Sequence, residues 1–215
     1  MVSDETVARL GAIFTSTLSN ALEDVGEDGV ILGLPSVGPG MRCAGRALCV
    51  AQTTGPAGAF SGSDFRVGAM IDAATRGDIV VVANNGHCVS SWGGTASYAA
   101  KLKGIAGLIV DGGVRDREEM IEHALPVFSR HMVPTTGRTR IRVDQIGGTV
   151  TVSGIRVATG DVIVADGTGI VCVPQEKAVD VLEIAESLQD DDEQAVHEIS
   201  NGLTFAEAMA KFRKI

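Results

Sequence analysis

Apolar residues recur at helical spacing near the start of the chain, at Val7, Leu10, Phe14, Leu18, Ala21 and Val25. This spacing predicts one amphipathic helix over residues 3–26, which Ser3 or Asp4 can cap and Gly26 can end. Near the other end, the pattern predicts a helix over 177–188 and a last one from Thr204 to about Arg213. The acidic run at 190–193 between them is typical of a solvated surface.

The middle of the chain alternates between apolar strands and helices. Strands are expected at 46–52, 79–83 and 105–110, and a further one begins at 127. Helices are expected at 65–76, with Ser63 as N-cap and Gly77 as its stop, at 95–103 and at 116–123. After Arg140 the pattern changes to short β segments separated by Gly and Asp turns. Together these elements predict a layered α/β fold with a central mixed sheet.

The length and composition favour one domain over 1–215, with the N-terminal helix (3–26) and the C-terminal helices (175–213) as appendages. The net charge of −9 leaves no basic face for a nucleic-acid backbone, so a nucleic-acid partner is not expected. No apolar run approaches the roughly 20 residues that span a bilayer, so no membrane partner is expected either. Without a secretion signal the expected location is cytoplasmic. The four cysteines lack metal-site spacing and suggest reduced, mostly buried side chains.

Two glycine-rich segments are candidate binding loops. The loop at 54–64 (TGPAGAFSGSD) could hold an anion at a helix start, but it matches no nucleotide fingerprint, which favours a simple turn. In WGGTAS, Gly93 and Gly94 precede a helix whose first N–H groups, at Thr95 and Ala96, suit a small carboxylate. A glycine-rich helix entry packed by Trp92 explains the same pattern, and spacing alone leaves both explanations open.

The segment GLIVDGGVRDREEM, residues 107–120, carries the most specific chemistry. A buried strand is expected to end at Asp111, turn on Gly112 and Gly113, and present Arg115 and Asp116 at a helix start. In α/β folds such strand ends carry the functional groups. A guanidinium can hold a 2-oxo acid and stabilise its enolate, and a neighbouring carboxylate suits Mg²⁺ or Mn²⁺. A surface ion pair with a helix-capping Asp is the structural alternative.

The run WGGTASYAAKLKGIAGLIVDGGVRD, followed by GDVIVADGTGIVCVP, resembles the 4-hydroxy-4-methyl-2-oxoglutarate aldolase and ribonuclease E activity regulator (RraA-like) family, which includes class II pyruvate aldolases. The resemblance extends over most of the chain. It implies α/β/β/α layering like that of the swivelling phosphohistidine domain. It also implies a homotrimer or homohexamer with active sites between subunits.

The resemblance also implies roles for individual residues. Arg115 would contact the 2-oxo oxygen, Asp116 would hold Mg²⁺ or Mn²⁺, and the backbone at 93–96 (Gly93, Gly94, Thr95 and Ala96) would receive the carboxylate of a small 2-oxo acid. An acid from a neighbouring subunit, Glu193 or Asp192, is expected near the metal. Regulators in the family tend to lack the carboxylate after the arginine, which this chain keeps as Asp116. The aldolases often carry Asp or Glu where this chain has Gly94.

These observations predict a divalent-metal-dependent lyase that cleaves a carbon–carbon bond of a 2-oxo acid through pyruvate enolate. Both retro-aldol cleavage of a 4-hydroxy-4-methyl-2-oxoglutarate-type substrate and decarboxylation of oxaloacetate pass through that enolate. A Schiff-base route is disfavoured because none of the five lysines lies in an apolar stretch that would lower its pKa. The alternative function is a non-catalytic, protein-binding regulator of the ribonuclease E type.

Overall fold

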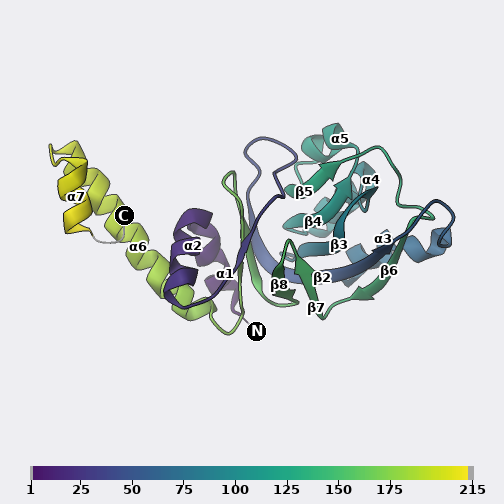
Figure 1. Cartoon of the computed structure of the whole chain (residues 1–215), viewed down its shortest axis with the longest axis horizontal. Helices are drawn as coiled ribbons and strands as arrows, with labels where there is room; N and C mark the ends of the chain where they lie inside the picture. Colours follow the sequence, from purple (N-terminus) through teal and green to yellow (C-terminus); the bar gives the residue numbers. More distant parts are fainter. Residues whose placement is uncertain (1, 213–215) are drawn as a thin grey trace.

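The computed structural model describes residues 2–212 (Figure 1). The helices are α1 (Asp4–Ala12), α2 (Thr15–Asp24), α3 (Val67–Ala73), α4 (Gly94–Lys103), α5 (Arg117–Glu122), α6 (Ala178–Ser200) and α7 (Phe205–Lys211), with a short 3₁₀ helix η1 (Gly62–Phe65). The strands are β1 (Val30–Ile31), β2 (Cys43–Thr54), β3 (Ile79–Ser90), β4 (Gly107–Val114), β5 (Val127–Met132), β6 (Ile141–Ile146), β7 (Thr149–Val152), β8 (Ile155–Ala158), β9 (Val162–Ala165) and β10 (Ile170–Val173). No helix in this part of the chain has the length and apolar character needed to cross a bilayer.

The main sheet is mixed, as the sequence predicted. Its strand order is β1-β10-β9-β2-β3-β4-β5, and β6 pairs with β2. Strands β2 to β5 run parallel because α3, α4 and α5 lie in their connections, whereas β9, β10, β1 and β6 pair antiparallel. The long strand β2 joins the two parts: residues 43–46 pair with β9, and residues 47–51 pair with β3.

Three apolar clusters show that the elements stack in four layers. One cluster lies between α3–α5 and the parallel strands, and includes Val50, Val80 and Leu108. A second lies between the parallel strands and β9–β10, where alternate residues such as Cys49 and Ile163 meet. The third packs α1, α2 and α6 on the far face of β9–β10. The order is therefore α/β/β/α, which Figure 1 shows from left to right.

The single N-terminal helix predicted over 3–26 is wrong, because the chain forms two helices that break at Ile13–Phe14. Ser3 caps α1 as expected, accepting from the Thr6 N–H at 3.0 Å. At the break, Arg42 donates to the carbonyl oxygens of Gly11 and Ile13 at 2.7 and 2.9 Å. Asp166 accepts the N–H and hydroxyl of Thr15 at 2.9 and 2.7 Å. Distant residues thus satisfy both new helix ends, which local spacing cannot reveal.

Several boundaries in the middle of the chain also differ from the prediction. Strands β3 and β4 continue to Ser90 and Val114, so Gly112 and Gly113 lie within a strand and form no turn. The helix predicted over 65–76 begins only at Val67, and Ser61 caps η1 before it, so Ser63 is not the N-cap.

At the C-terminus, the acidic run of 190–193 lies within α6, which continues to Ser200, well beyond the predicted end at 188. The last helix, α7, ends at Lys211, and the predicted end near Arg213 lies outside the described residues.

The cysteines follow the prediction except for one. Cys43, Cys49 and Cys172 are buried free thiols, whereas Cys88 is exposed. Burial raises the pKa of Cys43 to about 12 and that of Cys49 to about 11. At neutral pH these two thiols are therefore protonated and act as small apolar side chains.

Asp166→Ala is expected to lower the free energy of unfolding at pH 7 by about 1–2 kcal/mol, because it removes a buried, charged helix cap. Burial opposes ionisation, but hydrogen bonds from Thr15, Thr168 and Gly169 outweigh it and hold the pKa of Asp166 below its usual value. The cap is therefore fully effective above the unfolded pKa of about 3.9, and it is lost as the pH falls through the lower folded value. Urea titrations of the variant and the unchanged protein at pH 7 and pH 3 measure both free energies of unfolding. The difference between the two proteins should be smaller at pH 3.

The exposed Asp28 provides the control. Asp28→Ala should change the free energy of unfolding by less than about 0.5 kcal/mol. Equal losses for the two variants would show that Asp166 does not hold α2 in place.

Candidate active site

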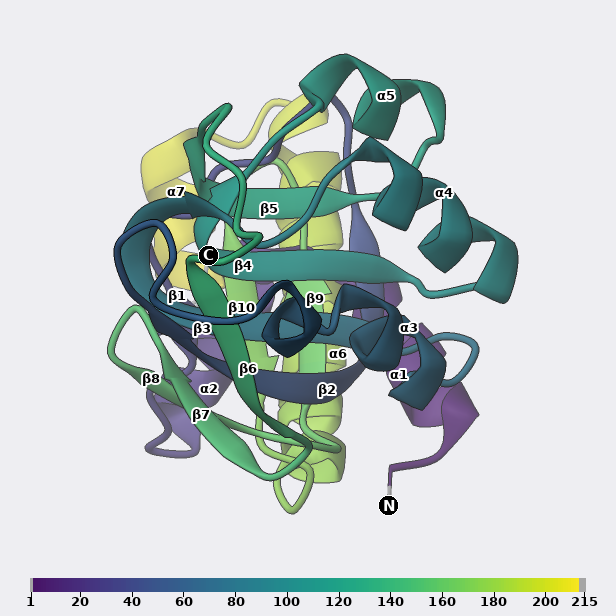
Figure 2. The ribbon, with the colours of Figure 1, turned by 90° about the vertical axis from the view of Figure 1, so that its right-hand side faces the viewer.

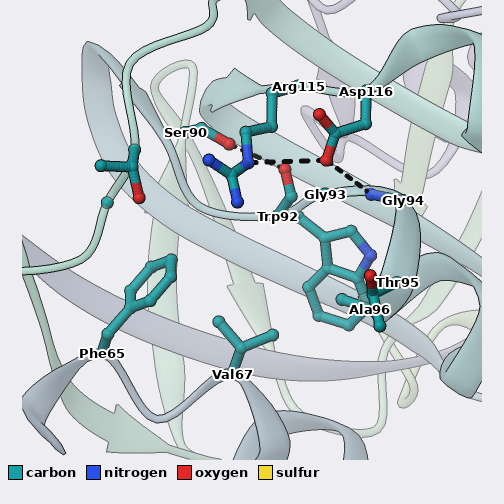
Figure 3. Close-up of a pocket in the computed structure, with 12 residues that line it drawn as sticks. Phe65, Val67, Ser90, Trp92, Gly93, Gly94, Thr95, Ala96, Arg115 and Asp116 are labelled. Atoms are coloured by element: carbon teal, nitrogen blue, oxygen red, sulfur yellow. Dashed lines mark hydrogen bonds and ion pairs between the residues drawn. The ribbon is translucent and has the colours of Figure 1, made fainter. Parts of the chain in front are cut away.

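A cavity of about 200 Å³ opens where β3 and β4 lead into α4 and α5 (Figure 3). We call it the Arg115 cavity; it is lined by Phe65, Val67, Ser90, Trp92, Gly93, Gly94, Thr95, Ala96, Arg115, Asp116, Thr136 and Gly137. All six predicted site residues outside α6 thus line one cavity: Arg115, Asp116 and the four residues at 93–96. A functional site at the carboxyl ends of parallel strands is typical of open α/β sheets.

The backbone fixes Arg115 and Asp116 at the end of β4. The Arg115 N–H donates to the Trp92 carbonyl at 3.1 Å, which ties the end of β4 to the segment after β3. Asp116 follows in a left-handed conformation, with φ of 61°, immediately before α5. Such a conformation is uncommon outside glycine, although Asp tolerates it better than most residues. The turn brings the Asp116 carboxylate back toward the first residue of α4.

The carboxylate of Asp116 joins the two helix starts. Its Oδ2 accepts the Gly94 N–H at 3.0 Å and lies 3.5 Å from Nε of Arg115 (Figure 3). The two side chains are 37% and 43% exposed, so their mutual attraction is screened by water and adds little to stability. The ion pair therefore contributes little to the stability of the fold. The two side chains matter because they place opposite charges at the cavity.

The start of α4 offers backbone donors to the same cavity. The first N–H groups of a helix have no partner within it, and here Asp116 takes that of Gly94. Those of Thr95 and Ala96 remain for a ligand, at the positive end of the helix dipole. Trp92 is fully buried beneath them and donates through Nε1 to Ser97 at 3.1 Å. The helix-entry packing and the carboxylate-binding geometry proposed from the sequence are thus compatible.

The side chain of Glu119 explains why residue 94 is a glycine, and the sequence pattern did not indicate this contact. A Cβ at this position would collide with the carboxylate of Glu119 and would lie 2.7 Å from Glu119 Cβ. Glu119 follows Asp116 by three residues, so both acids face the start of α4 from one side of α5. The i,i+3 spacing in DREE could have suggested this pairing, but its partner at Gly94 is distant in sequence.

Asp111 does not line the cavity, although the sequence predicted that the strand ends there. It is buried within β4 and forms an ion pair with Arg130, whose Nε lies 2.6 Å from Oδ1. Its Oδ2 accepts the Ser153 N–H at 3.0 Å. These bonds attach the β7–β8 hairpin to the sheet, which is a structural role.

The carboxylate of Asp116 is an oxygen ligand of the kind that a hard divalent cation prefers. Hydrogen bonding engages Oδ2 of Asp116, and Oδ1 carries no hydrogen bond within the described structure (Figure 3). No group of three or more His, Cys, Asp or Glu side chains that could hold a metal occurs among residues 2–212. One carboxylate fits Mg²⁺, which commonly binds through one or two protein carboxylates and keeps several waters.

Glu193 and Asp192 lie on α6, away from the Arg115 cavity. In Figure 1, α6 extends to the left while α4 and α5 lie at the upper right. Glu193 accepts from Gln189 one turn before it, at 3.1 Å. Within one chain these acids therefore do not approach Asp116, and their expected role concerns a neighbouring copy.

The sequence matches the family model described as RraA-like, Aldolase/RraA, over residues 15–172. The chain belongs to this family. The family contains aldolase-type members as well as non-catalytic regulators of ribonuclease E. The match extends over most of the chain, including every residue of the Arg115 cavity.

Individual relatives support the same assignment. A protein from Halalkalibacterium halodurans named "Putative 4-hydroxy-4-methyl-2-oxoglutarate aldolase" is 30% identical over 156 residues, which cover 71% of this chain and 74% of that protein. Two further curated relatives match over 122 and 196 residues, and these matches span 58% and 31% of their respective lengths.

Solved structures confirm the fold. An uncharacterised protein from Pseudomonas syringae superposes with a TM-score of 0.87 at 29% identity, covering 96% of this chain and 98% of its own. RraAS2 from Streptomyces coelicolor, described as an unusual member of the RNase ES inhibitor RraA family, gives 0.83 at 22% identity, covering 92% and 100%.

Gly94→Ala is expected to lower the free energy of unfolding by about 1–3 kcal/mol, because the added methyl group forces Glu119 and α5 to move. Gly68 is the matched control, since it also lies in the first turn of a helix and a Cβ there meets nothing within 4 Å. Gly68→Ala should be neutral or slightly stabilising. Thermal unfolding of both variants tests the contact, and similar stability of the two would contradict it.

Proposed function

We propose that this protein is a divalent-metal-dependent lyase that cleaves a carbon–carbon bond of a 2-oxo acid through pyruvate enolate. The supporting observation is that Arg115, Asp116 and the first three residues of α4 line one small cavity. Candidate reactions are retro-aldol cleavage of a 4-hydroxy-4-methyl-2-oxoglutarate-type substrate and decarboxylation of oxaloacetate. The named aldolase relative favours the first reaction.

The substrate's orientation follows from the charges around the cavity. The Thr95 and Ala96 N–H groups receive the carboxylate of the pyruvyl unit at the positive end of α4. Arg115 then holds the 2-oxo oxygen. As the bond breaks, this oxygen gains negative charge, and a preorganised guanidinium stabilises that charge more than it stabilises the neutral ketone.

Asp116 is the residue that would hold Mg²⁺ or Mn²⁺, through the Oδ1 that its bond to Gly94 leaves available. A bound cation supplies Lewis acidity beside the 2-oxo oxygen. The hydrogen bond from Gly94 fixes the direction of the carboxylate, so the cation would be held without rearrangement of α5.

The lysines nearest in sequence lie far from the cavity, which argues against a Schiff base. Lys101 donates to the Ala124 carbonyl at 2.9 Å, and Lys103 donates to the carbonyls of Ile71 and Asp72 at 2.8 and 2.6 Å. Both occupy the C-terminal end of α4, roughly 10 and 13 Å along the helix from Gly94. Neither amine reaches a substrate held at the N-terminal end.

A second copy of the chain is proposed to complete the site. The outer part of α6 and α7 exposes Val196, Ile199, Phe205 and Met209, an apolar surface that suits contact with another subunit. Glu193 lies on the same part of α6. We propose a homotrimer or homohexamer in which Glu193 approaches Asp116 of its neighbour.

The same exposed surface favours the second candidate function, a protein-binding regulator like the ribonuclease inhibitors of the family. The two functions differ in one measurable property. A regulator would not release pyruvate from any 2-oxo acid under any metal condition.

Arg115→Ala and Asp116→Ala are each expected to reduce kcat/KM for pyruvate release from oxaloacetate at least about a hundredfold, the usual loss for one preorganised charge contact. Glu122→Gln, which changes an exposed acid on the helix that follows them (α5), should remain within twofold of the unchanged protein. A coupled lactate dehydrogenase assay with Mn²⁺, and with a chelator, measures all four proteins.

Three outcomes would contradict the lyase proposal as stated. Wild-type-like turnover in both alanine variants would place the chemistry elsewhere. A covalent adduct with pyruvate after borohydride reduction would indicate a lysine mechanism. Absence of pyruvate release in the unchanged protein would favour the regulator.

Mixing inactive subunits tests the composite site. Asp116→Asn and Glu193→Gln should each lose activity alone. A co-refolded 1:1 mixture should regain roughly a quarter of it, because about one site in four then pairs an unmodified Asp116 with an unmodified Glu193 of the neighbour. Size-exclusion chromatography with light scattering confirms assembly. Glu198→Gln on the same helix is the control. Full activity of Glu193→Gln would contradict a role for the neighbouring helix.

A further inference from the structure

The side chain of Glu119 lies against Gly94, the first residue of α4. A Cβ built on Gly94 would lie 2.6 Å from Cδ of Glu119 and 2.7 Å from its Cβ, and it would overlap the carboxylate oxygen Oε2. The carboxylate of Glu119 therefore occupies the space into which any side chain at position 94 would project. It reaches this space from the first turn of α5.

Gly94 thus lies between two carboxylates. Its N–H donates to Oδ2 of Asp116 at 3.0 Å, and its Cα faces the carboxylate of Glu119. The two acids are three residues apart at the start of α5, which places them on one face of that helix. Because Gly94 and Asp116 both line the Arg115 cavity, Glu119 lies at the edge of the same cavity.

Capping of α5 does not explain this orientation. Asp116 is the N-cap of α5 and Glu119 is its third residue, which are the two positions of a capping box. The chain forms such boxes at the starts of η1 and α7. At α5, however, the Asp116 side chain makes no cap hydrogen bond and takes the Gly94 N–H of the neighbouring helix instead. The Glu119 side chain likewise extends toward α4.

The charges at this edge of the cavity suit a divalent cation. Arg115 balances the charge of Asp116, since its Nε lies 3.5 Å from Oδ2. The carboxylate of Glu119 adds a further negative charge and further oxygen ligands beside this pair. Two neighbouring carboxylates repel each other, and a divalent cation between them converts that repulsion into two attractions. Mg²⁺ commonly binds through one or two protein carboxylates and keeps several waters.

We propose that Glu119 is the second carboxylate that holds the divalent cation, together with Asp116. The inference rests on the proposed lyase function and adds a residue to its metal centre. Both acids belong to the segment that directly follows Arg115, so one short stretch of chain places the guanidinium and the cation relative to each other. This contribution comes from the chain that forms the cavity, and it is separate from that of Glu193 in a neighbouring copy.

The glycine at position 94 is part of this arrangement. Without a side chain there, Glu119 can reach the start of α4. A carboxylate carried by residue 94 itself would project into the same space, because its Cβ would coincide with the carboxylate of Glu119. The edge of the cavity therefore has room for one carboxylate at this place, supplied by residue 119 or by residue 94 but not by both.

Binding of Mn²⁺ measures the contribution of Glu119 independently of turnover. Glu119→Gln keeps the size of the side chain and removes its charge. Its Kd for Mn²⁺, measured by calorimetry and by electron paramagnetic resonance of the free ion, should rise at least about tenfold, within the usual range for losing a group that supports a metal site. Glu122→Gln, which removes an exposed acid further along α5, is the control and should stay within about twofold.

Relocating the carboxylate distinguishes a metal ligand from a packing residue. Glu119→Gly removes the side chain that fills the space beside residue 94. Combined with Gly94→Asp, it should restore the Kd for Mn²⁺ to within about threefold of the unchanged protein. Combined with Gly94→Ala, it fills the same space without a carboxylate, so the Kd should stay at least about tenfold higher. Thermal unfolding in the presence of a chelator should give similar midpoints for the two double variants.

Pyruvate release from oxaloacetate gives a second readout. Glu119 is proposed to hold the cation without contacting the substrate. Glu119→Gln should therefore need at least about tenfold more Mn²⁺ for half-maximal activity, while kcat at saturating Mn²⁺ stays within about threefold of the unchanged protein.

The outcomes separate this inference from the proposed function. If the unchanged protein binds Mn²⁺ and releases pyruvate, and Glu119→Gln binds Mn²⁺ with the same Kd, the role of Glu119 is wrong while the lyase function stands. Equal Kd values for the two double variants would also contradict that role, because they would make residue 119 a matter of packing alone. If the unchanged protein neither binds Mn²⁺ nor releases pyruvate, both proposals fail together.

Discussion

The Arg115 cavity depends on one hydrogen bond, from the Gly94 N–H to the carboxylate of Asp116. This bond joins the start of α4 to the start of α5, and it forms because Asp116 adopts a left-handed conformation directly after β4. Parallel pairing of β3 with β4 brings the two strand ends side by side. The bond then fixes the carboxylate against the first turn of α4, beside the guanidinium of Arg115.

Glycine positions allow this close approach. Gly94 leaves space for Glu119, and Gly137 leaves space for the ring of Phe65. In Figure 2, α4 and α5 lie next to each other on the side of the sheet that faces the viewer. The result is a small cavity with a charged wall and an apolar wall. The charged wall carries Arg115 and Asp116, and the apolar wall carries Phe65 and Val67.

The sequence predicted much of this arrangement. The apolar strands, the helices between them and the mixed sheet follow from periodicity, and all six predicted residues outside α6 line the cavity. The prediction was wrong where distant residues decide the outcome. The N-terminal helix breaks because Arg42 and Asp166 satisfy the new helix ends, and β4 continues through Asp111 because Arg130 and Ser153 bind its carboxylate. Glu119, Phe65 and Val67 escaped notice because their importance lies in contacts with Gly94, Gly137 and the opposite wall.

By itself, the amino-acid sequence determined most of the segments that form strands and helices, and it placed Arg115 and Asp116 at a strand end near glycine-rich backbone. These properties depend on neighbours within a few residues, where spacing and residue type act directly. Only the tertiary structure decided which charges face one another, where carboxylates are buried in structural pairs, and which apolar side chains face the charged wall. Such contacts join positions tens of residues apart, and the pairing of strands that creates them is a collective property of the whole sheet.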